Sequence, residues 1–344
     1  MFKPKYVISS RLLANIKRIT EIITNLNNQS FSGVVLAELE KRAREISAFS
    51  STSIEGNPLP LTDVKRILKI RPEHIRDSEK EVLNYNKALI ELNDLIRHKK
   101  QVFDLPLILK IQKTIIQGLI EDYRSGCLRR EPVFVNNPRT RQAIYLPPEQ
   151  SEVSKLMDDL FDYIKKNENV IDPLILAGIF HKQFVIIHPF IDGNGRTSRL
   201  ATKVLLAKTG LNTFNLFSFE NYYNKNVSKY FQEVGLVGNY YEIKDKIDFT
   251  SWLEYFTDGI IDELLRVGKE LEHENISPEK ELKDYHKKII DYIEKHGYIS
   301  DRDYAKLTKR AKPTRNLDFR KLIELDIIEK LGKGKATYYK LKNK

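Results

Sequence analysis

The chain is organised around one stretch, His188-Pro189-Phe190-Ile191-Asp192-Gly193-Asn194-Gly195-Arg196-Thr197-Ser198-Arg199. Gly193 and Gly195 can adopt backbone angles that other residues avoid, so the amides around Asn194 can point in one direction. The segment from Arg196 to Lys208 has apolar side chains at helical spacing and is predicted to be a helix. A glycine turn that leads into a helix N-terminus offers free N–H groups and a favourable dipole, which favours an anion site.

The charged residues of the stretch suit the same anion. Arg196 and Arg199 are three residues apart, so they share a helix face from which both guanidinium groups could bind phosphate oxygens. Asp192 precedes the turn, where an oxygen ligand for Mg²⁺ would share the phosphates. His188 has the side chain best suited to general-base catalysis near neutral pH. Each residue alone has an ordinary structural explanation, but their ordered combination predicts a phosphate site.

The stretch also resembles a known signature. It is similar to the Fic-domain motif His-Pro-Phe-x-(Asp/Glu)-Gly-Asn-Gly-Arg-x-x-Arg and matches it at every fixed position. The resemblance implies a mainly α-helical fold, with a helical Fic core and a small β-hairpin flap. It also implies an enzyme that transfers AMP from ATP to a serine, threonine or tyrosine hydroxyl of a target protein.

The resemblance also implies a role for each signature residue. His188 would deprotonate the target hydroxyl, and Asp192 would hold Mg²⁺. The glycine turn would cradle the phosphates, with Asn194 at the α-phosphate. Arg196 and Arg199 would contact the outer phosphates.

A short acidic motif ends an earlier helical run. Apolar residues predict a helix over about Val34 to Ser53, with Gly56 as its C-cap. Glu55 lies at the C-terminal end, where a carboxylate is unfavourable for the helix dipole. The segment Ser51-x-x-x-Glu55-Gly56 resembles the inhibitory motif of the Fic family, in which the glutamate pairs with the second signature arginine, here Arg199, where the γ-phosphate would lie. Whether Glu55 also positions a water that removes AMP from the target stays open.

Two short β-prone runs predict a hairpin. They are Val133-Phe134-Val135 and Ala143-Ile144-Tyr145-Leu146, and the turn-rich link from Asn136 to Thr140 joins them. Together with Gly126-Cys127-Leu128-Arg129, they resemble the Fic flap, which covers the nucleotide and aligns the target. An exposed strand edge can bind an extended segment through main-chain hydrogen bonds, so we expect the target to dock there. The sequence assigns no role to individual flap residues.

The helix before the signature is predicted to be buried. It spans Asp172 to Ile187, starts with an Asp-Pro pair and is apolar nearly all round. His181 and Lys182 interrupt that pattern and are expected to be structural. After the signature, Tyr230 and Phe231 match the aromatic pair that packs near the adenine in the Fic family.

The C-terminal residues are basic and resemble a winged helix. From Ser277 onward the chain has 19 Lys and Arg against 11 Asp and Glu. The predicted order is helix, strand, helix, helix and hairpin, which suits either DNA binding or protein docking. In the DNA-binding alternative, the major groove would be entered by the helix that begins near Lys312, Thr314, Arg315 and Asn316. The phosphates would be contacted by Lys333 and Lys335.

The 344 residues are enough for two or three domains. We expect an N-terminal helical region with the acidic motif over residues 1–100, a Fic core over 101–270 and a winged-helix-like module over 277–344. The net charge of +11 favours an anionic partner such as ATP, nucleic acid or an acidic protein.

The expected compartment is the cytoplasm. The single cysteine, Cys127, cannot form an internal disulfide, which suggests a reducing environment. The first residues are charged and lack the apolar run of a signal peptide. No uncharged apolar stretch approaches the ~20 residues of a membrane helix, so no membrane contact is expected.

Two functions from different classes remain open at this point. The first is an autoinhibited protein AMP transferase that uses ATP and Mg²⁺. The alternative is a DNA-binding regulator whose Fic core senses nucleotide without turnover. The target protein, the acceptor residue type and the oligomeric state, including a homodimer, are not determined by the sequence.

Overall fold

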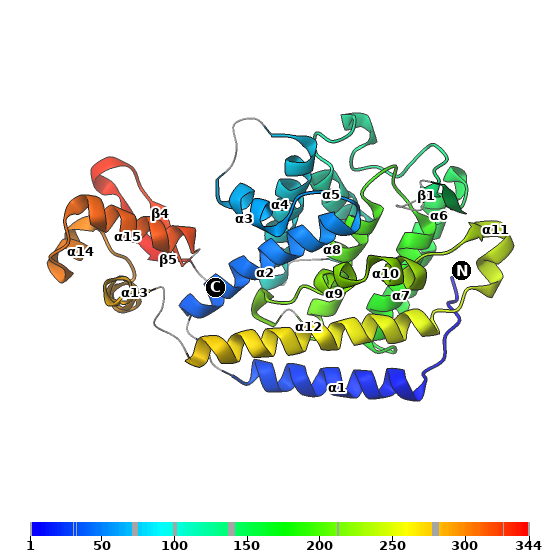
Figure 1. The fold of residues 1–344 in the computed structure, drawn as a ribbon, viewed down its shortest axis with the longest axis horizontal. Helices are drawn as coiled ribbons and strands as arrows, with labels where there is room; N and C mark the ends of the chain where they lie inside the picture. The colour runs from blue at the N-terminus through cyan, green and yellow to red at the C-terminus, as the bar shows by residue number, and fades with distance from the viewer. Residues whose placement is uncertain are drawn as a thin grey trace. The chain divides into compact units, whose positions relative to one another are not determined.

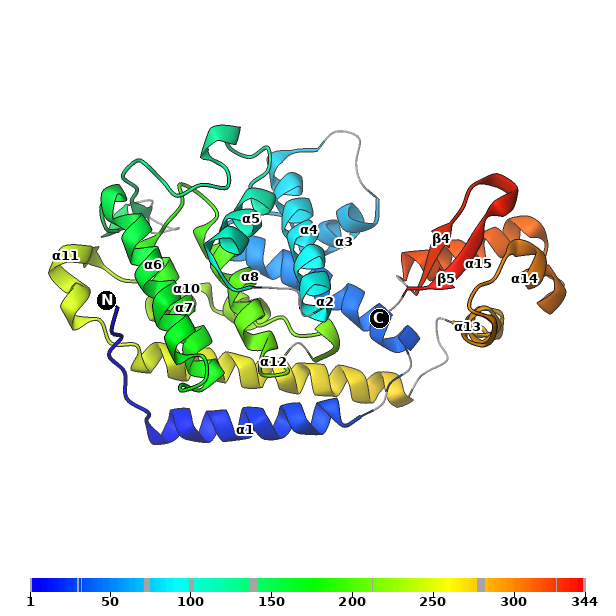
Figure 2. The same cartoon turned by 180° about the vertical axis from the view of Figure 1, so that it is seen from behind.

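A computed structural model describes residues 2–29, 31, 33–70, 75–98, 102–136, 142–211, 213–276, 282–325 and 327–342. Helices dominate these residues, as Figures 1 and 2 show from opposite sides, and the expected mainly α-helical fold is confirmed. The chain divides into two compact units. One contains Met1–Asn28 and Ala43–Val267, and the other contains Gln29–Arg42 and Gly268–Lys344.

The helices that begin before residue 277 build the site and its surroundings. They are α1 (Ser10–Asn27), α2 (Gly33–Ile54), α3 (Leu61–Lys69), α4 (Asp77–Arg97), α5 (Leu105–Ile115), α6 (Gln150–Asn167), α7 (Pro173–Ile187), α8 (Asn194–Ala207), α9 (Glu220–Lys225), α10 (Val227–Val234), α11 (Tyr240–Ile243) and α12 (Thr250–Ile276). The helices predicted over Val34 to Ser53 and up to Ile187 agree with α2 and α7 to within one residue.

Helix α7 is the buried centre of its unit, as predicted. Asp172 is its N-cap and accepts a hydrogen bond from the Leu174 N–H at 2.8 Å. The helix is buried over 13 of its 15 residues and packs most extensively against α8. His181 is structural, because its ring nitrogens contact the Thr202 hydroxyl at 3.1 Å and the Tyr230 hydroxyl at 3.0 Å. Helix α7 therefore carries His188 to the site on a rigid element.

Helix α12 contacts α7, and helix α1 contacts α12. Trp252 of α12 is fully buried, and its indole N–H donates to the Gly178 carbonyl of α7 at 2.8 Å. Helix α1 lies along α12 in both views, and Ser9 and Asn15 form side-chain hydrogen bonds to that helix. Helix α12 therefore braces α7, and α1 braces α12.

The predicted hairpin is part of a three-stranded sheet. Strand β1 (Val135–Asn136) pairs antiparallel with β2 (Ala143–Leu146), as expected, although Val133 and Phe134 are not in the strand. Strand β3 (Gly238–Asn239), which the sequence did not predict, pairs parallel with β2. Most of the predicted link, residues 137–140, lies outside the described residues.

The C-terminal unit contains three helices and a hairpin in the predicted order. The elements are α13 (Asp284–His296), α14 (Asp301–Leu307), α15 (Lys312–Glu324), β4 (Ile328–Leu331) and β5 (Tyr338–Leu341). Instead of a strand, the segment around Ile299 forms an isolated bridge to Tyr339. A buried cluster that includes Phe319 and Leu322 is the core of this unit. The assignment as a winged helix, and its role, stay predictions.

Arg315 does not have a free guanidinium group in this unit. It binds both carboxylate oxygens of Asp301, at 2.8 and 2.9 Å, and also donates to the Arg310 carbonyl. A side chain held in this way would have to leave its partners before it could contact a DNA base. Lys333 is exposed, and the side chain of Lys335 is outside the described residues.

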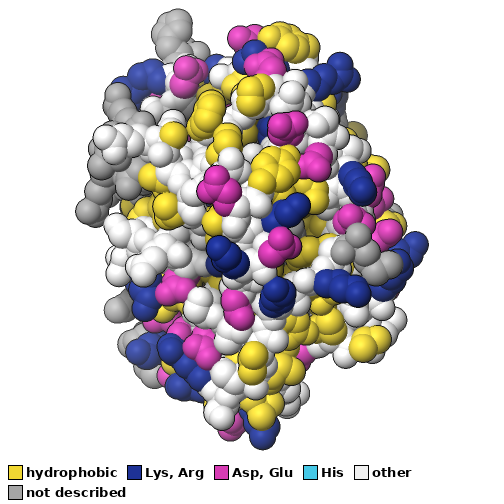
Figure 3. Space-filling model, turned by 90° about the vertical axis from the view of Figure 1, so that its right-hand side faces the viewer, with side chains coloured by type: hydrophobic (Ala, Val, Ile, Leu, Met, Phe, Trp, Pro, Cys, Tyr) yellow, Lys and Arg dark blue, Asp and Glu magenta, His cyan; other side chains and the backbone are white. Residues whose placement is uncertain are grey.

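One face of the molecule shows no basic patch. Figure 3 shows charges of both signs interspersed on the side of the molecule at the right of Figure 1. The net positive charge therefore does not gather into one patch on the face that Figure 3 shows.

Within the described ranges, no helix is both long enough and apolar enough to cross a membrane.

Asp172→Ala removes the side chain that caps α7. Because the Leu174 N–H loses its acceptor, we expect the free energy of unfolding to fall by about 1 kcal/mol. Asp172→Ser keeps a capping oxygen and should retain most of that stability. Urea denaturation followed by circular dichroism compares the two variants, and equal stabilities would contradict the assignment of the cap.

Candidate functional site

His188 ends α7 in a left-handed backbone conformation, with φ 52° and ψ 59°. Positive φ is uncommon for a residue with a side chain, and here it turns the chain sharply out of the helix. The His188 N–H donates to the Phe184 carbonyl at 3.0 Å and closes the helix. Nδ1 lies 3.3 Å from the Val185 carbonyl, so Nδ1 carries the proton and Nε2 keeps a free lone pair.

The environment keeps the imidazole neutral. Burial lowers the pKa of His188 to about 4, and the positive charge of Arg129 acts in the same direction. The Val185 carbonyl and the carboxylates of Glu55 and Asp192 oppose this shift. At neutral pH the ring is therefore neutral, with its proton on Nδ1 and none on Nε2, which is the form that a general base requires.

The glycine turn has the predicted left-handed geometry at Gly193 but not at Gly195, which is the second residue of α8 and has no positive φ. Gly193 has φ 84°, and a Cβ atom there would lie only 2.9 Å from Cγ2 of Ile116, so both the conformation and the space require glycine. Asn194 is 3% exposed and braces the turn, because its side chain accepts from the Phe190 N–H and donates to the Phe190 carbonyl, both at 2.9 Å. The second amide hydrogen of Asn194 remains available for another acceptor.

Helix α8 begins directly at this turn, at Asn194 rather than at the predicted Arg196. Its first amides have no preceding helical carbonyl to bind, so they can serve an anion. The carboxylate of Glu55 already lies close to these first amides of α8. A Cβ atom at Gly195 would be 2.2 Å from Oε1 of Glu55, which shows how closely that carboxylate approaches the turn.

Arg199 is fully buried and is held by α2. Its Nη2 lies 2.8 Å from Oε1 of Glu55, and also donates to the Ser51 carbonyl at 2.8 Å. Its Nε donates to the Ser51 hydroxyl at 2.8 Å. The third nitrogen, Nη1, is buried without a hydrogen-bond partner. The residues of the acidic motif and the second signature arginine therefore meet, with Gly56 in the left-handed conformation just beyond.

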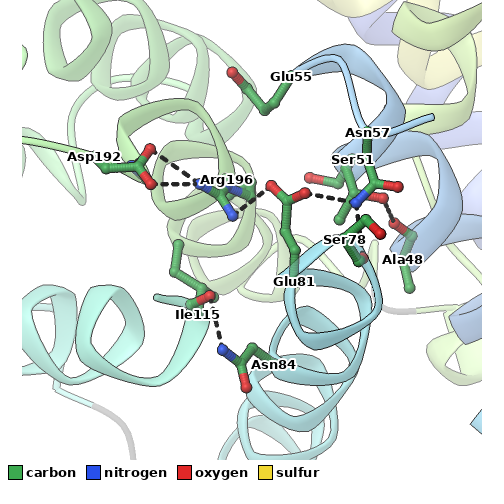
Figure 4. Close-up of polar contacts among 12 residues, drawn as sticks. Ala48, Ser51, Glu55, Asn57, Ser78, Glu81, Asn84, Ile115, Asp192 and Arg196 are labelled. Carbon is green, nitrogen blue, oxygen red and sulfur yellow. Dashed lines mark hydrogen bonds and ion pairs between the residues drawn. The ribbon is translucent and has the colours of Figure 1, made fainter. Parts of the chain in front are cut away.

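Arg196 is engaged by two other carboxylates, as Figure 4 shows. Nη2 contacts the two oxygens of Asp192 at 3.0 and 3.1 Å, and Nη1 lies 2.5 Å from Oε1 of Glu81. Asn57, which follows the acidic motif, donates to the other oxygen of Glu81 at 2.6 Å. Burial raises the pKa of Glu81, although Arg196 and Asn57 oppose that shift. The sequence analysis missed Glu81 because it lies far from the signature in the chain.

The predicted aromatic pair, Tyr230 and Phe231, lies on α10. Tyr230 is 1% exposed, stacks on Tyr223 with ring centroids 4.5 Å apart and bonds His181 through its hydroxyl. Phe231 is half-buried. Covered on one face by Tyr223, Tyr230 shows no open face for adenine in this structure, and the adenine contact stays a prediction for both residues.

The residues fit a magnesium–triphosphate ligand in part. Arg196 Nε and Arg199 Nη1 are buried donors without hydrogen-bond partners, so this corner of the site has unused capacity for phosphate oxygens. Asp192 keeps its side chain 47% exposed beside the turn. A single carboxylate suits Mg²⁺ that takes its other ligands from phosphates and water, and no group of three metal-binding side chains occurs in the residues that the structure describes.

A second polar contact ties α2 to α8 one helical turn away. The ammonium of Lys203 bonds the Ser47 hydroxyl at 3.0 Å and pairs with the fully buried Glu220 at 3.2 Å. Ser47 and Ser51 of α2, and Glu55 just after its last residue, are spaced by four residues and contact Lys203 and Arg199 of α8. A serine stripe on a buried helix face was the signal that the sequence analysis could have used.

Comparison with known proteins identifies this arrangement. Residues 102–206 match the profile of the Fic/DOC family. This part of the chain is therefore similar to the Fic/DOC family. The signature and the predicted flap lie within the matched region, whereas the acidic motif of α2 lies before it.

Curated relatives are similar over a longer part of the chain. The protein adenylyltransferase Fic of Aedes aegypti is 29% identical over 220 residues, which cover 58% of this chain and 42% of that protein. The protein of the same name from Drosophila erecta is 27% identical over 221 residues, which cover 59% and 43%. This chain therefore matches less than half of the length of these curated relatives.

Solved structures share the fold. A Fic family protein from Desulfovibrio desulfuricans G20 has a TM-score of 0.67 and 22% identity, covering 100% of this chain and 99% of that one. Fic-1 from C. elegans has a TM-score of 0.59 and 20% identity over 76% of this chain and 73% of that one. At these identities the likeness concerns the Fic fold alone.

The state of His188 can be measured directly. Because burial and Arg129 disfavour the imidazolium, we expect its ring resonances to titrate with a midpoint of about 4. Histidine-selective isotope labelling and nuclear magnetic resonance, from well below pH 4 up to neutral pH, would follow the ring, and His188→Ala would assign its signals. A midpoint near 6.5 would show that the imidazole is not buried as described.

Proposed function

We propose that this protein transfers AMP from ATP to a hydroxyl side chain of a target protein, and that Glu55 holds it in a state of low activity. The observation that carries the proposal is the Glu55 carboxylate, which pairs with Arg199 at 2.8 Å and lies against Gly195. An acidic group there occupies the donors that an outer phosphate would need. The Fic domain and the names of its relatives support the reaction class.

The geometry supports a separate role in the reaction for each of the signature residues. Nε2 of His188 accepts the proton of the target hydroxyl, and the oxygen forms a bond to the α-phosphorus. The bond from that phosphorus to the bridging oxygen breaks, and pyrophosphate leaves. Mg²⁺ beside Asp192 would neutralise phosphate charge. Arg199 and Arg196 would stabilise the phosphates once their carboxylate partners release them.

Inhibition follows from the same charges. Glu55 removes one donor face of Arg199 and places a negative charge next to the position of the triphosphate. Because Arg199 is fully buried, an anion must accompany it, and Glu55 and a phosphate compete for that place. Removal of AMP from the target through a water positioned by Glu55 remains a further hypothesis about the same carboxylate.

The DNA-binding regulator gains no specific support. Arg315, one of its four candidates for the major groove, is held by Asp301 within the C-terminal unit. We therefore propose the enzyme alone, without naming the target, its acceptor residue or the oligomeric state.

Glu55→Gly should raise AMP transfer at least about tenfold, which corresponds to about 1.4 kcal/mol of the barrier. Glu55→Gln is the matched control for shape, because it keeps the side chain but removes the charge, and should give an intermediate gain. The measurement is incubation with α-labelled ATP and Mg²⁺, with and without cell lysate, followed by identification of labelled bands. Equal labelling by wild type and both variants would contradict the inhibitory role, and the absence of any labelling would contradict the reaction.

His188→Ala in the Glu55→Gly protein should lower AMP transfer by about 10²–10⁴-fold, because the hydroxyl loses its base. The affinity for ATP should stay nearly unchanged, because the phosphate donors lie on α8 rather than on the imidazole. Isothermal titration with ATP provides that second measurement. Retained ATP binding with lost transfer separates a catalytic role from a collapse of the site.

A further inference from the structure

Arg129 joins the signature to the flap through its backbone and side chain. It is 3% exposed, and its backbone N–H donates to the Pro189 carbonyl at 2.9 Å. Its Nε donates to the His188 carbonyl at 2.8 Å. Two adjacent residues of the signature are therefore held by one residue that lies outside it.

The other end of the guanidinium group reaches the segments next to the hairpin. Nη1 donates to the Glu131 carbonyl at 3.1 Å, and Nη2 donates to the Pro148 carbonyl. Glu131 precedes β1 and Pro148 follows β2, so these contacts hold both ends of the hairpin. One planar side chain thus fixes the hairpin and the His188 backbone at a set separation.

The partners of Arg129 are unusual for a buried cation. Within the described part of the chain, Arg129 forms no ion pair, and all its side-chain hydrogen bonds go to carbonyl groups. Burial lowers the pKa of its guanidinium group, which shows the cost of placing the charge there. The C-terminal end of α7 offsets part of this cost, because its last carbonyls carry partial negative charge and lack helical partners.

We propose that Arg129 is a positioning residue for AMP transfer, holding the His188 imidazole in register with the hairpin along which a target segment would lie. This proposal rests on the proposed function and adds a residue to it. Arg129 contacts neither the glycine turn nor the two arginines in the hydrogen bonds described, so it acts on the target side of the reaction. Its role is exerted through the backbone of His188, which is in a left-handed conformation and needs external support.

The proposal predicts different effects on the rate of AMP transfer and on the affinity for ATP. A base displaced by about 1 Å can cost about 10²-fold in rate, whereas phosphate binding depends on groups that Arg129 does not touch. Loss of Arg129 should therefore lower the rate of transfer at saturating ATP by at least tenfold. The dissociation constant of ATP should stay within about twofold. A general loss of structure would weaken both together.

The test uses the full chain with Glu55→Gly, to which Arg129→Gln or Arg129→Lys is added. Arg129→Lys keeps the charge but cannot reach three carbonyls at once, so its rate should lie between those of Arg129→Gln and the parent. Arg124→Gln is the matched control, because Arg124 bonds the Glu131 carboxylate at 2.9 and 3.1 Å in the same segment without contacting His188. Its transfer rate should equal that of the parent.

Three readouts decide the outcome: labelling of the strongest lysate band by α-labelled ATP, titration calorimetry with ATP, and the His188 ring resonances. Slow labelling with intact ATP binding and shifted His188 resonances would support the proposal. Unchanged labelling, or equal losses in labelling and ATP affinity, would overturn it. If the Glu55→Gly parent labels nothing, the proposed function fails, and the resonances alone then judge Arg129: an unshifted His188 ring in Arg129→Lys would reject the positioning role.

Discussion

The buried guanidinium group of Arg199 is the group on which the site depends. Because a buried charge without a counter-ion is costly, this position always needs an anion beside it. In the structure Glu55 supplies that anion, and the carbonyl and hydroxyl of Ser51 complete the shell. The same position is therefore a structural counter-ion site and, in the function proposed above, the place where a phosphate would replace the carboxylate.

The two helices that flank the signature have separate tasks. Helix α8 presents free amides and arginines toward an anion, whereas α7 ends at the imidazole that would accept a proton. Helix α2 is attached to α8 at two levels, through Ser51 and Arg199 and, one turn away, through Ser47 and Lys203. The second attachment does not involve Glu55.

Local patterns predicted most of the elements, and long-range contacts explain what they missed. The run of apolar residues before His188 predicted a buried helix, and the β-prone residues at 143–146 predicted β2, because both signals arise within a few neighbouring residues. Strand β3 was missed because its two residues are stabilised by pairing with β2, nearly a hundred positions earlier. Glu81 and Arg129 were missed as site residues for the same reason, since their partners come from other segments.

The sequence by itself determined the signature, its glycine turn and the chemistry of an imidazole next to an anion-binding helix start, because these depend on residue type and spacing within twelve positions. It also indicated that Glu55 and Arg199 would meet, through resemblance to a family. Only the tertiary structure decided that Arg196 is held by Glu81 and Asp192, and that Arg129 spans the signature and the hairpin. Those contacts depend on the packing of separate helices and loops, which brings together side chains that no local pattern connects.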